Sequence, residues 1–374
     1  MIQKKMMKYL FSIALCLLLC SNGHGAGKGD VSSSKTFNKN YKVDKKASIE
    51  VTNKYGQVII NSWAKDSIVI KVKVTSFAKD RDAADKLLDR VEFDFNRAGE
   101  FVVAETVIDR SKGFLKDLWD DLDNYSRGLL STKGKVTVNY EVYAPKYTNI
   151  KISNKFGDIY LDNFKGDVKV GLANGNLKTD EIIGGFDLNM SFGRANINNI
   201  NNGIFVLRSA DVEIERAKDI DLTSSSSTLV VSKLSLLKME SRNDKLRIDS
   251  LQVLRGNSSF TKINVKSLSR TVFADMNYGE LNIELVKPGF RDIELLGKST
   301  DFDLLFFEHS LVNINLVGKE SNMLIGAGDY EKSVYENDDK LTKITGTIGT
   351  GKDKNGTVNI HADGGKLSIR YTLN

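Results

Sequence analysis

The stretch NKFGDIYLDNF at residues 154–164 has a near copy, NKYGQVIINSW, at residues 53–63. Both begin with asparagine, lysine, an aromatic residue and glycine, and both continue with apolar residues at alternate positions. Alternation with a period of two is typical of a β-strand that has one buried face. The same turn and strand, written twice, therefore predict a repeating structural unit.

The unit recurs along the middle of the chain. The residues at the glycine position, which we call anchors, follow one another at steps of 17 or 18: Gly157, Gly175, Gly193, Ala210, Ser227, Asp244, Thr261 and Gly279. Mostly apolar residues stand two and four positions after each anchor. The residue seven positions after each anchor is always apolar: Phe164, Ile182, Ile200, Ala217, Leu234, Leu251, Leu268 and Val286.

A second alternating pair follows ten to thirteen positions after most anchors: Val168 with Val170, Phe186 with Leu188, Ile204 with Val206, Ile220 with Leu222, and Leu237 with Met239. Each unit thus holds two short strands, and one unit alone cannot bury their inward side chains. Stacked units bury them continuously. The sequence therefore predicts an all-β chain, a parallel β-solenoid (β-helix) of 17–18-residue, two-strand coils. Glycine at the anchor is expected to supply a positive φ at the corner.

The regular coils are expected over 150–292, followed by irregular coils and closing strands over 293–374. The strands that follow Gly356 and Gly365 are expected to cap the end of the stack. Residues 41–149 are predicted to form N-terminal strands and a cap. A solenoid needs a cap because its end would otherwise expose an open sheet edge. The cap includes an amphipathic helix over 78–91 and an inserted helix or loop over 111–130. Packing over the cap is favoured for the insert, with a docking helix as the alternative.

The first residues have the pattern of a signal peptide, 1–26, followed by a flexible segment, 27–40. Three lysines precede the apolar run 9–20, which is too short to span a bilayer. Cys20 leaves a lipid anchor as an alternative. The bulky Leu19 before it favours ordinary cleavage, because a lipidation site prefers a small residue there.

Cysteine usage and charge exclude several classes of function. Both cysteines, Cys16 and Cys20, lie in the signal peptide, so the mature chain would have no disulfide, no thiol nucleophile and no zinc site built on sulfur. The formal net charge is +6, and residues 1–26 contribute three lysines and no acid to it. With no long basic run, nucleic-acid binding is not expected.

No pattern of catalytic residues stands out. The mature chain would keep two histidines, His309 and His361, which excludes a three-histidine metal site. The serine run 224–227 is interpreted as stacked turn residues, and DKNG at 353–356 as a polar turn. Paired glycosidase carboxylates are not indicated, because the candidate acids fall at different positions of the unit: Asp158, Asp180, Asp187 and Asp211. We therefore expect no enzyme, no catalytic residue, no metal and no cofactor.

A family resemblance rests on the order of several segments. NKYGQVIINSW, DSIVIKVKV, a short helix and VNYEVYAPKYTNIKISNKFGDIYLDNFKGDVKV together resemble the bacterial putative-adhesin family of exported β-strand-repeat proteins. This is a domain-of-unknown-function family related to auto-transporter adhesin head domains. The likeness runs from about residue 40 to 374, with 111–130 as an addition. It implies an exported, non-enzymatic, right-handed β-solenoid, and it transfers no catalytic or ligand-binding residue.

Two roles lead the functional hypotheses. One is a cell-surface adhesin or binding module that presents outward side chains to a surface glycan or an envelope protein. The other is a periplasmic structural or envelope-stress accessory protein, and a glycan-active enzyme is a weaker alternative. A transmembrane span is not expected. One candidate polar face, for which solvated turns are the favoured interpretation, consists of Asn196, Asn198, Asn199, Asn201 and Asn202.

Overall fold

A computed structural model describes residues 31–108, 135–319, 321–335, 341–351 and 354–372. The predicted signal peptide, 1–26, and the predicted insert, 111–130, lie outside the described residues. Within the described part the chain forms 24 strands and one helix, so the expectation of an all-β protein is confirmed. No helix in this part is long and apolar enough to cross a membrane.

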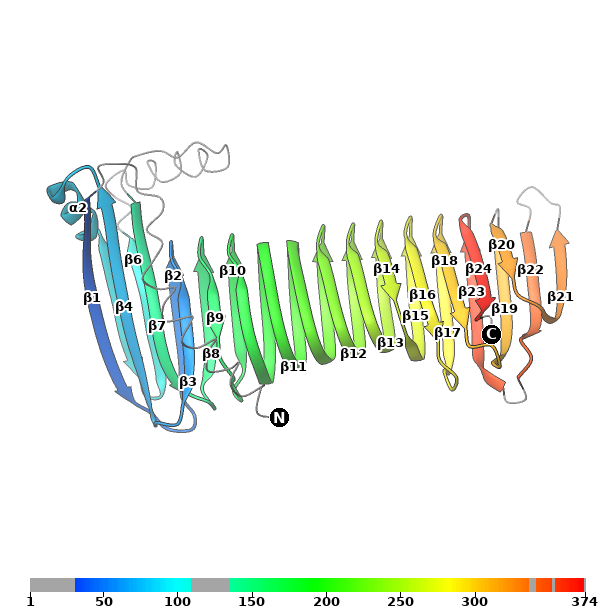
Figure 1. Cartoon of the computed structure of the whole chain (residues 1–374), viewed down its shortest axis with the longest axis horizontal. Coiled ribbons are helices and arrows are strands. Elements are labelled where there is room, and N and C mark those ends of the chain that lie inside the picture. Colours follow the sequence, from blue (N-terminus) through cyan, green and yellow to red (C-terminus); the bar gives the residue numbers. More distant parts are fainter. Residues whose placement is uncertain (1–30, 109–134, 320, 336–340, 352–353, 373–374) are drawn as a thin grey trace, which may run out of the picture. The chain divides into compact units, whose positions relative to one another are not determined.

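The elements follow in this order (Figure 1). Their bounds are β1 Val31–Lys42, β2 Ser48–Lys54, β3 Val58–Trp63, β4 Ser67–Ala78, α2 Arg81–Leu88, β5 Val91–Ala98, β6 Phe101–Ile108, β7 Lys135–Pro145, β8 Asn149–Lys155, β9 Ile159–Leu161, β10 Val168–Ala173, β11 Leu177–Ser225, β12 Thr228–Arg242, β13 Lys245–Ser259, β14 Lys262–Val265, β15 Leu268–Asn277, β16 Glu280–Val286, β17 Asp292–Lys298, β18 Asp301–Phe306, β19 Leu311–Lys319, β20 Asn322–Ile325, β21 Gly328–Tyr335, β22 Leu341–Ile348, β23 Lys354–Asp363 and β24 Lys366–Tyr371.

The smaller of two compact units contains the helix. Its described residues are 31–36, 73–92, 107–108 and 135–137. The helix expected over 78–91 forms at α2, where the Asp80 carboxylate accepts from the Ala83 amide at 2.8 Å as an N-cap. Ala84 and Leu88 form its buried face.

The prediction of a flexible segment over 27–40 is wrong for residues 31–40, which belong to β1. The strand is mostly polar, so it lacks the alternation that identifies a half-buried strand in a sequence. It is part of the sheet through its pairing with β4, and polar side-chain contacts add to that pairing. Ser33 is buried and its hydroxyl donates to Asp85 at 2.5 Å, and Lys35 pairs with Asp89 at 2.6 Å.

The larger unit contains the repeat ladder, a name we use for strands β8 to β18. Its strands pair in parallel with their counterparts one unit away in sequence. Val168 in β10 lies between Ile150 and Phe186, each 18 positions away, and Leu229 in β12 lies between Val212 and Leu246, each 17 away. The sequence period is therefore the register of the sheet.

The core runs through the inside of the repeat ladder. The residues two, four and seven positions after every anchor are all buried, which confirms the prediction from periodicity. The most exposed of them is Ala217, with 8% of its surface accessible. Because each coil leaves its inward side chains bare on both sides, the neighbouring coils complete the burial.

The two copies of the opening motif lie side by side. β2 pairs with β8 so that Asn53 is opposite Asn154, and β3 pairs with β9 so that Val58 is opposite Ile159. The rings of Tyr55 and Phe156 stack at 5.5 Å with an interplanar angle of 9°. The repetition therefore records one coil placed directly on the next, with more than eighty residues inserted between them in the chain.

Among the anchor glycines only Gly193 has a positive φ, of 158°, so the glycines as a group do not supply the left-handed corner that the sequence predicts. The residue before the anchor does so in ten coils: Tyr55, Phe156, Asn174, Phe192, Ser209, Ser226, Asn243, Phe260, Tyr278 and Ser299. Glycine is needed for space instead. A Cβ on Gly157 would lie 2.0 Å from the Gly56 carbonyl oxygen, and one on Gly175 would lie 2.2 Å from the Gly157 oxygen.

One predicted strand register is wrong by a residue. Ile204 and Val206 were expected to point inward, but Ile204 is 58% exposed, and Phe205 and Leu207 are buried. In this coil the bend after Ile200 is one residue shorter than the bend in the preceding coil, as the buried Gly203 shows. A slip of one residue turns every side chain of a strand to the other face.

The closing strands do not cap the stack. β23 pairs in parallel with both β17 and β19, with Thr357 opposite Asp292 on one side and Asn313 on the other. β24 likewise lies between β18 and β20. Figure 1 shows this late segment, in red, between the yellow and orange coils. One edge of β19 pairs with β23, and its other edge is covered by the antiparallel strand β22, which in turn pairs with β21.

Candidate binding groove

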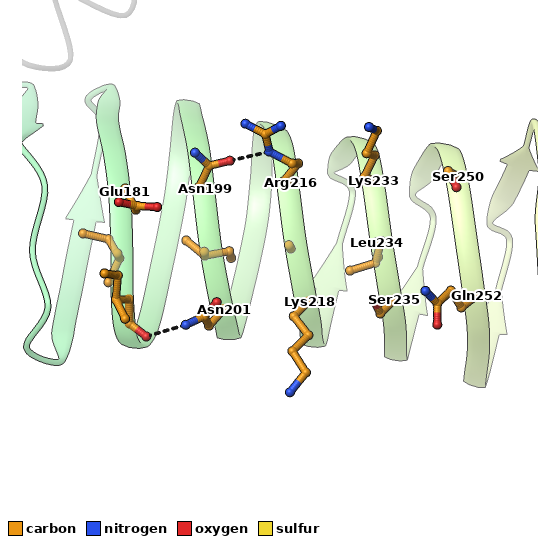
Figure 2. A pocket seen from close by; sticks show the side chains of 14 residues that line it. Glu181, Asn199, Asn201, Arg216, Lys218, Lys233, Leu234, Ser235, Ser250 and Gln252 are labelled. Carbon is orange, nitrogen blue, oxygen red and sulfur yellow. Dashed lines mark hydrogen bonds between the residues drawn. The ribbon is translucent and has the colours of Figure 1, made fainter.

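The five candidate asparagines do not form one face. Asn198 donates to Asp180 in the preceding coil at 2.6 Å, and Asn196 and Asn202 are exposed side chains. Asn199 and Asn201 lie elsewhere, on the wall of a groove. The groove follows the corner six to eight positions after the anchors of five successive coils. Figure 2 shows it, with its side chains projecting from neighbouring coils.

A small residue hollows the floor of this groove. The floor is formed by the residues seven positions after the anchors, including Ile200, Ala217 and Leu234. The coils on either side carry isoleucine or leucine at this position, whereas Ala217 has a single methyl group. Together the fourteen lining residues enclose about 600 Å³. The hollow therefore results from one short side chain in a row of long ones.

Cations gather around the hollow. Arg216 and Lys218 flank Ala217 in the chain, and Lys233 is opposite Arg216 in the parallel register. Glu181, two coils away from Arg216, is the one acid among the lining residues. Like charges placed opposite each other in a sheet destabilise it. The wall therefore concentrates positive charge at a cost to the fold.

Hydrogen bonds between coils hold part of the wall in place. The Arg216 Nε donates to the Asn199 amide oxygen at 2.9 Å, and the Asn201 amide nitrogen donates to the Ile183 carbonyl oxygen at 2.9 Å (Figure 2). Arg216 also lies 3.5 Å from a Glu215 carboxylate oxygen. These contacts tie the Arg216 guanidinium and both amides to neighbouring strands of the sheet.

A second, smaller depression lies on the outer face of the second strands. Arg255 stacks over the Phe273 ring at 5.2 Å, and Leu296 is 54% exposed beside His361, which is opposite it in register. Asp275 and Glu294 also line this depression. Its lining carries both positive and negative charges, so it does not favour ligands of either charge.

The structure gives the predicted acids no common site. Asp158 accepts from the Asn176 amide at 2.8 Å, Asp180 from Asn198 at 2.6 Å, and Asp187 pairs with Lys169 at 3.0 Å. Each of these contacts joins a coil to its neighbour. Among the described residues no group of three or more histidine, cysteine, aspartate or glutamate side chains is placed to hold a metal ion.

The remaining candidates have local partners. His309 Nε2 lies 3.2 Å from a Glu308 carboxylate oxygen. In the serine run, Ser224 and Ser227 are buried and both bond to Asp244, at 2.5 Å from the Ser224 hydroxyl and 2.6 Å from the Ser227 amide. The interpretation of the run as stacked turn residues is confirmed.

The cations of the groove were not predicted from the sequence, although their positions relative to the anchors indicate them. Arg216 and Lys233 both stand six positions after an anchor, and Lys218 stands eight positions after one. Aligned units would show these positions as two outward columns in adjacent coils. The charge of the whole chain hides them, because 54 basic residues are almost balanced by 48 acidic ones.

Comparisons with known proteins give a likeness in structure only. No family model matches the chain, and no curated protein matches it. A crystal structure of a putative cell adhesion protein from Clostridium sporogenes matches with 12% identity over 91% of this chain and 100% of that one, at a TM-score of 0.18.

Two further structures are similar in the same way. A putative adhesin from Parabacteroides distasonis matches with 11% identity over 87% of this chain and 97% of its own, at a TM-score of 0.32. A putative adhesin from Bacteroides fragilis matches with 11% identity over 90% and 97%, at a TM-score of 0.26.

Proposed function

We propose that the chain is an exported, non-enzymatic binding protein of the adhesin type, and that its repeat ladder is a right-handed β-solenoid. The parallel register at steps of 17 and 18 supports the solenoid. The hand follows from the general rule that a connection between parallel strands of one sheet is right-handed, since the strands twist that way.

The observation that carries the binding role is the cationic groove on consecutive coils. A solenoid buries its inward residues between coils, so its outward residues are free to meet a partner. Arg216, Lys218 and Lys233 stand in fixed register on such a surface. The register fixes the backbone positions from which these side chains extend, which lowers part of the cost of ordering them when a ligand binds. No described group of side chains supplies a comparable arrangement for catalysis.

The location of the chain tests this proposal. Intact and permeabilised cells are treated with a protease, and the chain is then detected with an antibody. A binding protein of the cell surface is expected to disappear from intact cells, while a periplasmic marker stays protected. Protection of the chain until the cells are permeabilised would favour the periplasmic structural or envelope-stress role.

Binding itself is tested with the purified mature chain, residues 27–374. The labelled chain is expected to bind whole cells or isolated envelope, and excess unlabelled chain is expected to compete. A variant with three alanine substitutions at exposed positions outside the groove, Lys238→Ala, Lys245→Ala and Arg247→Ala, is expected to bind as the unchanged chain does. It shows that the loss of three positive charges does not by itself abolish binding. Absence of saturable binding to any cell or envelope fraction would contradict the proposed function.

A further inference from the structure

We propose that the groove around Ala217 binds an acidic polysaccharide that lies along the stack of coils. This inference rests on the proposed binding function and names the ligand class of the same site. Its first support is unpaired charge. Within the part of the chain that the structure describes, neither the Lys218 side chain nor the Lys233 side chain makes a hydrogen bond or ion pair.

The placement of the cations indicates an anion shared between coils. Arg216 and Lys233 are opposite each other in adjacent parallel strands, which lie about 4.8 Å apart. An anion between them converts the repulsion into two attractive, charge-assisted contacts. Lys218 follows Ala217 in the chain and also lines the groove, and in Figure 2 its side chain extends to the side opposite that of Arg216 and Lys233.

The neutral side chains of the groove match sugar hydroxyl groups. Asn199, Asn201 and Gln252 carry amides, and Ser235 and Ser250 carry hydroxyls. Amides and hydroxyls both donate and accept hydrogen bonds, as sugar hydroxyls do. One groove therefore offers cations to the carboxylates of an acidic polysaccharide and hydrogen-bond partners to its hydroxyl groups.

The direction and length of the groove favour a linear polymer. Five successive coils contribute to its walls, which gives a length of about 20 Å at the spacing of parallel strands. Its two outward columns run along the stack, so a chain of several sugars fits lengthwise. A single small anion would use only the centre.

Nucleic acid is the competing polyanion, and the groove lacks what that ligand needs. None of the fourteen lining residues is aromatic. Proteins that bind single strands combine a positive groove with aromatic side chains on which the bases stack. A polymer of acidic sugars requires the charges and the hydroxyl partners without the rings.

The test measures binding of the mature chain to polygalacturonate, with dextran as the neutral polymer and poly(dT) as the competing polyanion. The groove variant carries Arg216→Ala, Lys218→Ala and Lys233→Ala. The matched control, Lys238→Ala, Lys245→Ala and Arg247→Ala, removes the same charge from exposed positions of other faces. The unchanged chain and the control are expected to bind polygalacturonate, with an affinity that falls as salt rises.

The groove variant is expected to bind about tenfold or more weakly than the control, because three charge-assisted contacts are lost. Ala217→Leu supplies a second variant, since Leu234 and Leu251 show that the next coils accept leucine there. It is expected to weaken binding while leaving the thermal unfolding temperature unchanged. Dextran is expected not to bind.

Three outcomes would overturn the inference: equal affinity of the groove variant and the control, equal affinity for dextran, or tighter binding to poly(dT). If the groove variant still binds cells as the control does, the binding function stands and the groove is not its site. If neither the unchanged chain nor any variant binds cells or polymers, the proposed function fails as well.

Discussion

The repeat ladder has two kinds of corner, which we call glycine corners and polar corners after the residue at the anchor. Both turn the chain in the same way, but different side chains fill them. At Gly175 and Gly193 the coils touch backbone to backbone, and the long side chains of Leu172 and Met190 fill the space that glycine leaves. At Ser227, Asp244 and Thr261 the anchors carry buried side chains. There the residue three positions earlier is a serine: Ser224, Ser241 and Ser258.

The polar corners replace volume with a chain of hydrogen bonds. The amide of each anchor donates to the side-chain oxygen of the next one: Ala210 to Ser227 at 3.2 Å, Ser227 to Asp244 at 2.6 Å, and Asp244 to Thr261 at 3.3 Å. The backbone therefore has the same shape at both kinds of corner, and two different combinations of side chains fill it. One combines a glycine anchor with a long apolar residue three positions earlier, and the other combines a polar anchor with a serine at that position. A corner that combines the anchor of one kind with the neighbour of the other is expected to be less stable.

The largest effect is expected at Asp244, which is 2% exposed. Its carboxylate accepts from the hydroxyls of Ser224 and Ser241 and from the amides of Ser227 and Arg242. Asp244→Ala leaves these donors without an acceptor and is expected to lower the free energy of unfolding by about 4 kcal/mol. Urea denaturation measures the loss.

The control for this change is Asp249→Ala. Asp249 pairs with Lys266 on the surface at 2.6 Å, where both side chains are at least half exposed. An exposed ion pair contributes little, so the expected loss is about 0.5 kcal/mol or less. Similar losses for Asp244 and Asp249 would show that the buried hydrogen bonds do not stabilise the polar corner.

At a glycine corner, Gly175→Ala is expected to cost about 3 kcal/mol, because its Cβ would lie 2.2 Å from the Gly157 carbonyl oxygen and the coils must move apart. Gly171→Ala, four residues earlier in the chain, is the control. The nearest atom to its Cβ would be 3.8 Å away, so no loss is expected. A Gly175 variant as stable as the Gly171 variant would contradict the steric role of the anchor glycine.

A smaller contrast lies within the polar corners. The Ser241 hydroxyl donates to Asp244 at 2.6 Å, so Ser241→Ala is expected to lose about 2 kcal/mol. The buried Ser258 hydroxyl has no hydrogen-bond partner among the described residues. Ser258→Ala is therefore expected to gain up to about 1 kcal/mol. Thermal unfolding of the two single variants would show opposite shifts, and shifts of the same sign would contradict this account.

The smallest effect concerns the residues before the anchors, which have positive φ at both kinds of corner. Ser209 has φ of 49°, a conformation that glycine adopts without steric cost. Ser209→Gly is expected to stabilise by about 0.5 kcal/mol, whereas Ser209→Val is expected to destabilise by about 1 kcal/mol. Calorimetry of both variants measures the difference, and equal stability would show that the corner relaxes.

The period of the sequence predicted the ladder because register and period are one quantity here. A residue such as Leu229 is buried for the same reason that Leu246 is, so one unit explains the next. The exceptions arise where a local change alters the count. The shortened bend before Gly203 moves Phe205 and Leu207 inward, and nothing in the alternation of Ile204 and Val206 reveals it.

Features that depend on neighbours in space were harder to predict. The place of β23 between β17 and β19 is invisible to a reading along the chain, since its own pattern fits any coil. The corner conformation of Phe156 and Tyr278 was also missed, because aromatic residues rarely adopt positive φ. To predict the hollow at Ala217, one has to compare the size of this residue with that of the residues opposite it in the neighbouring coils.

The interleaved position of residues 354–371 sets the order in which this end of the molecule can assemble. Because the chain appears from its N-terminal end first, β19 is available before the strand that separates it from β17. Until then two parallel strand edges of matching shape are bare, and each can pair with the other in place of its native neighbour. Folding of this end therefore waits for residues 354–371, and premature closure creates a kinetic trap that must reopen.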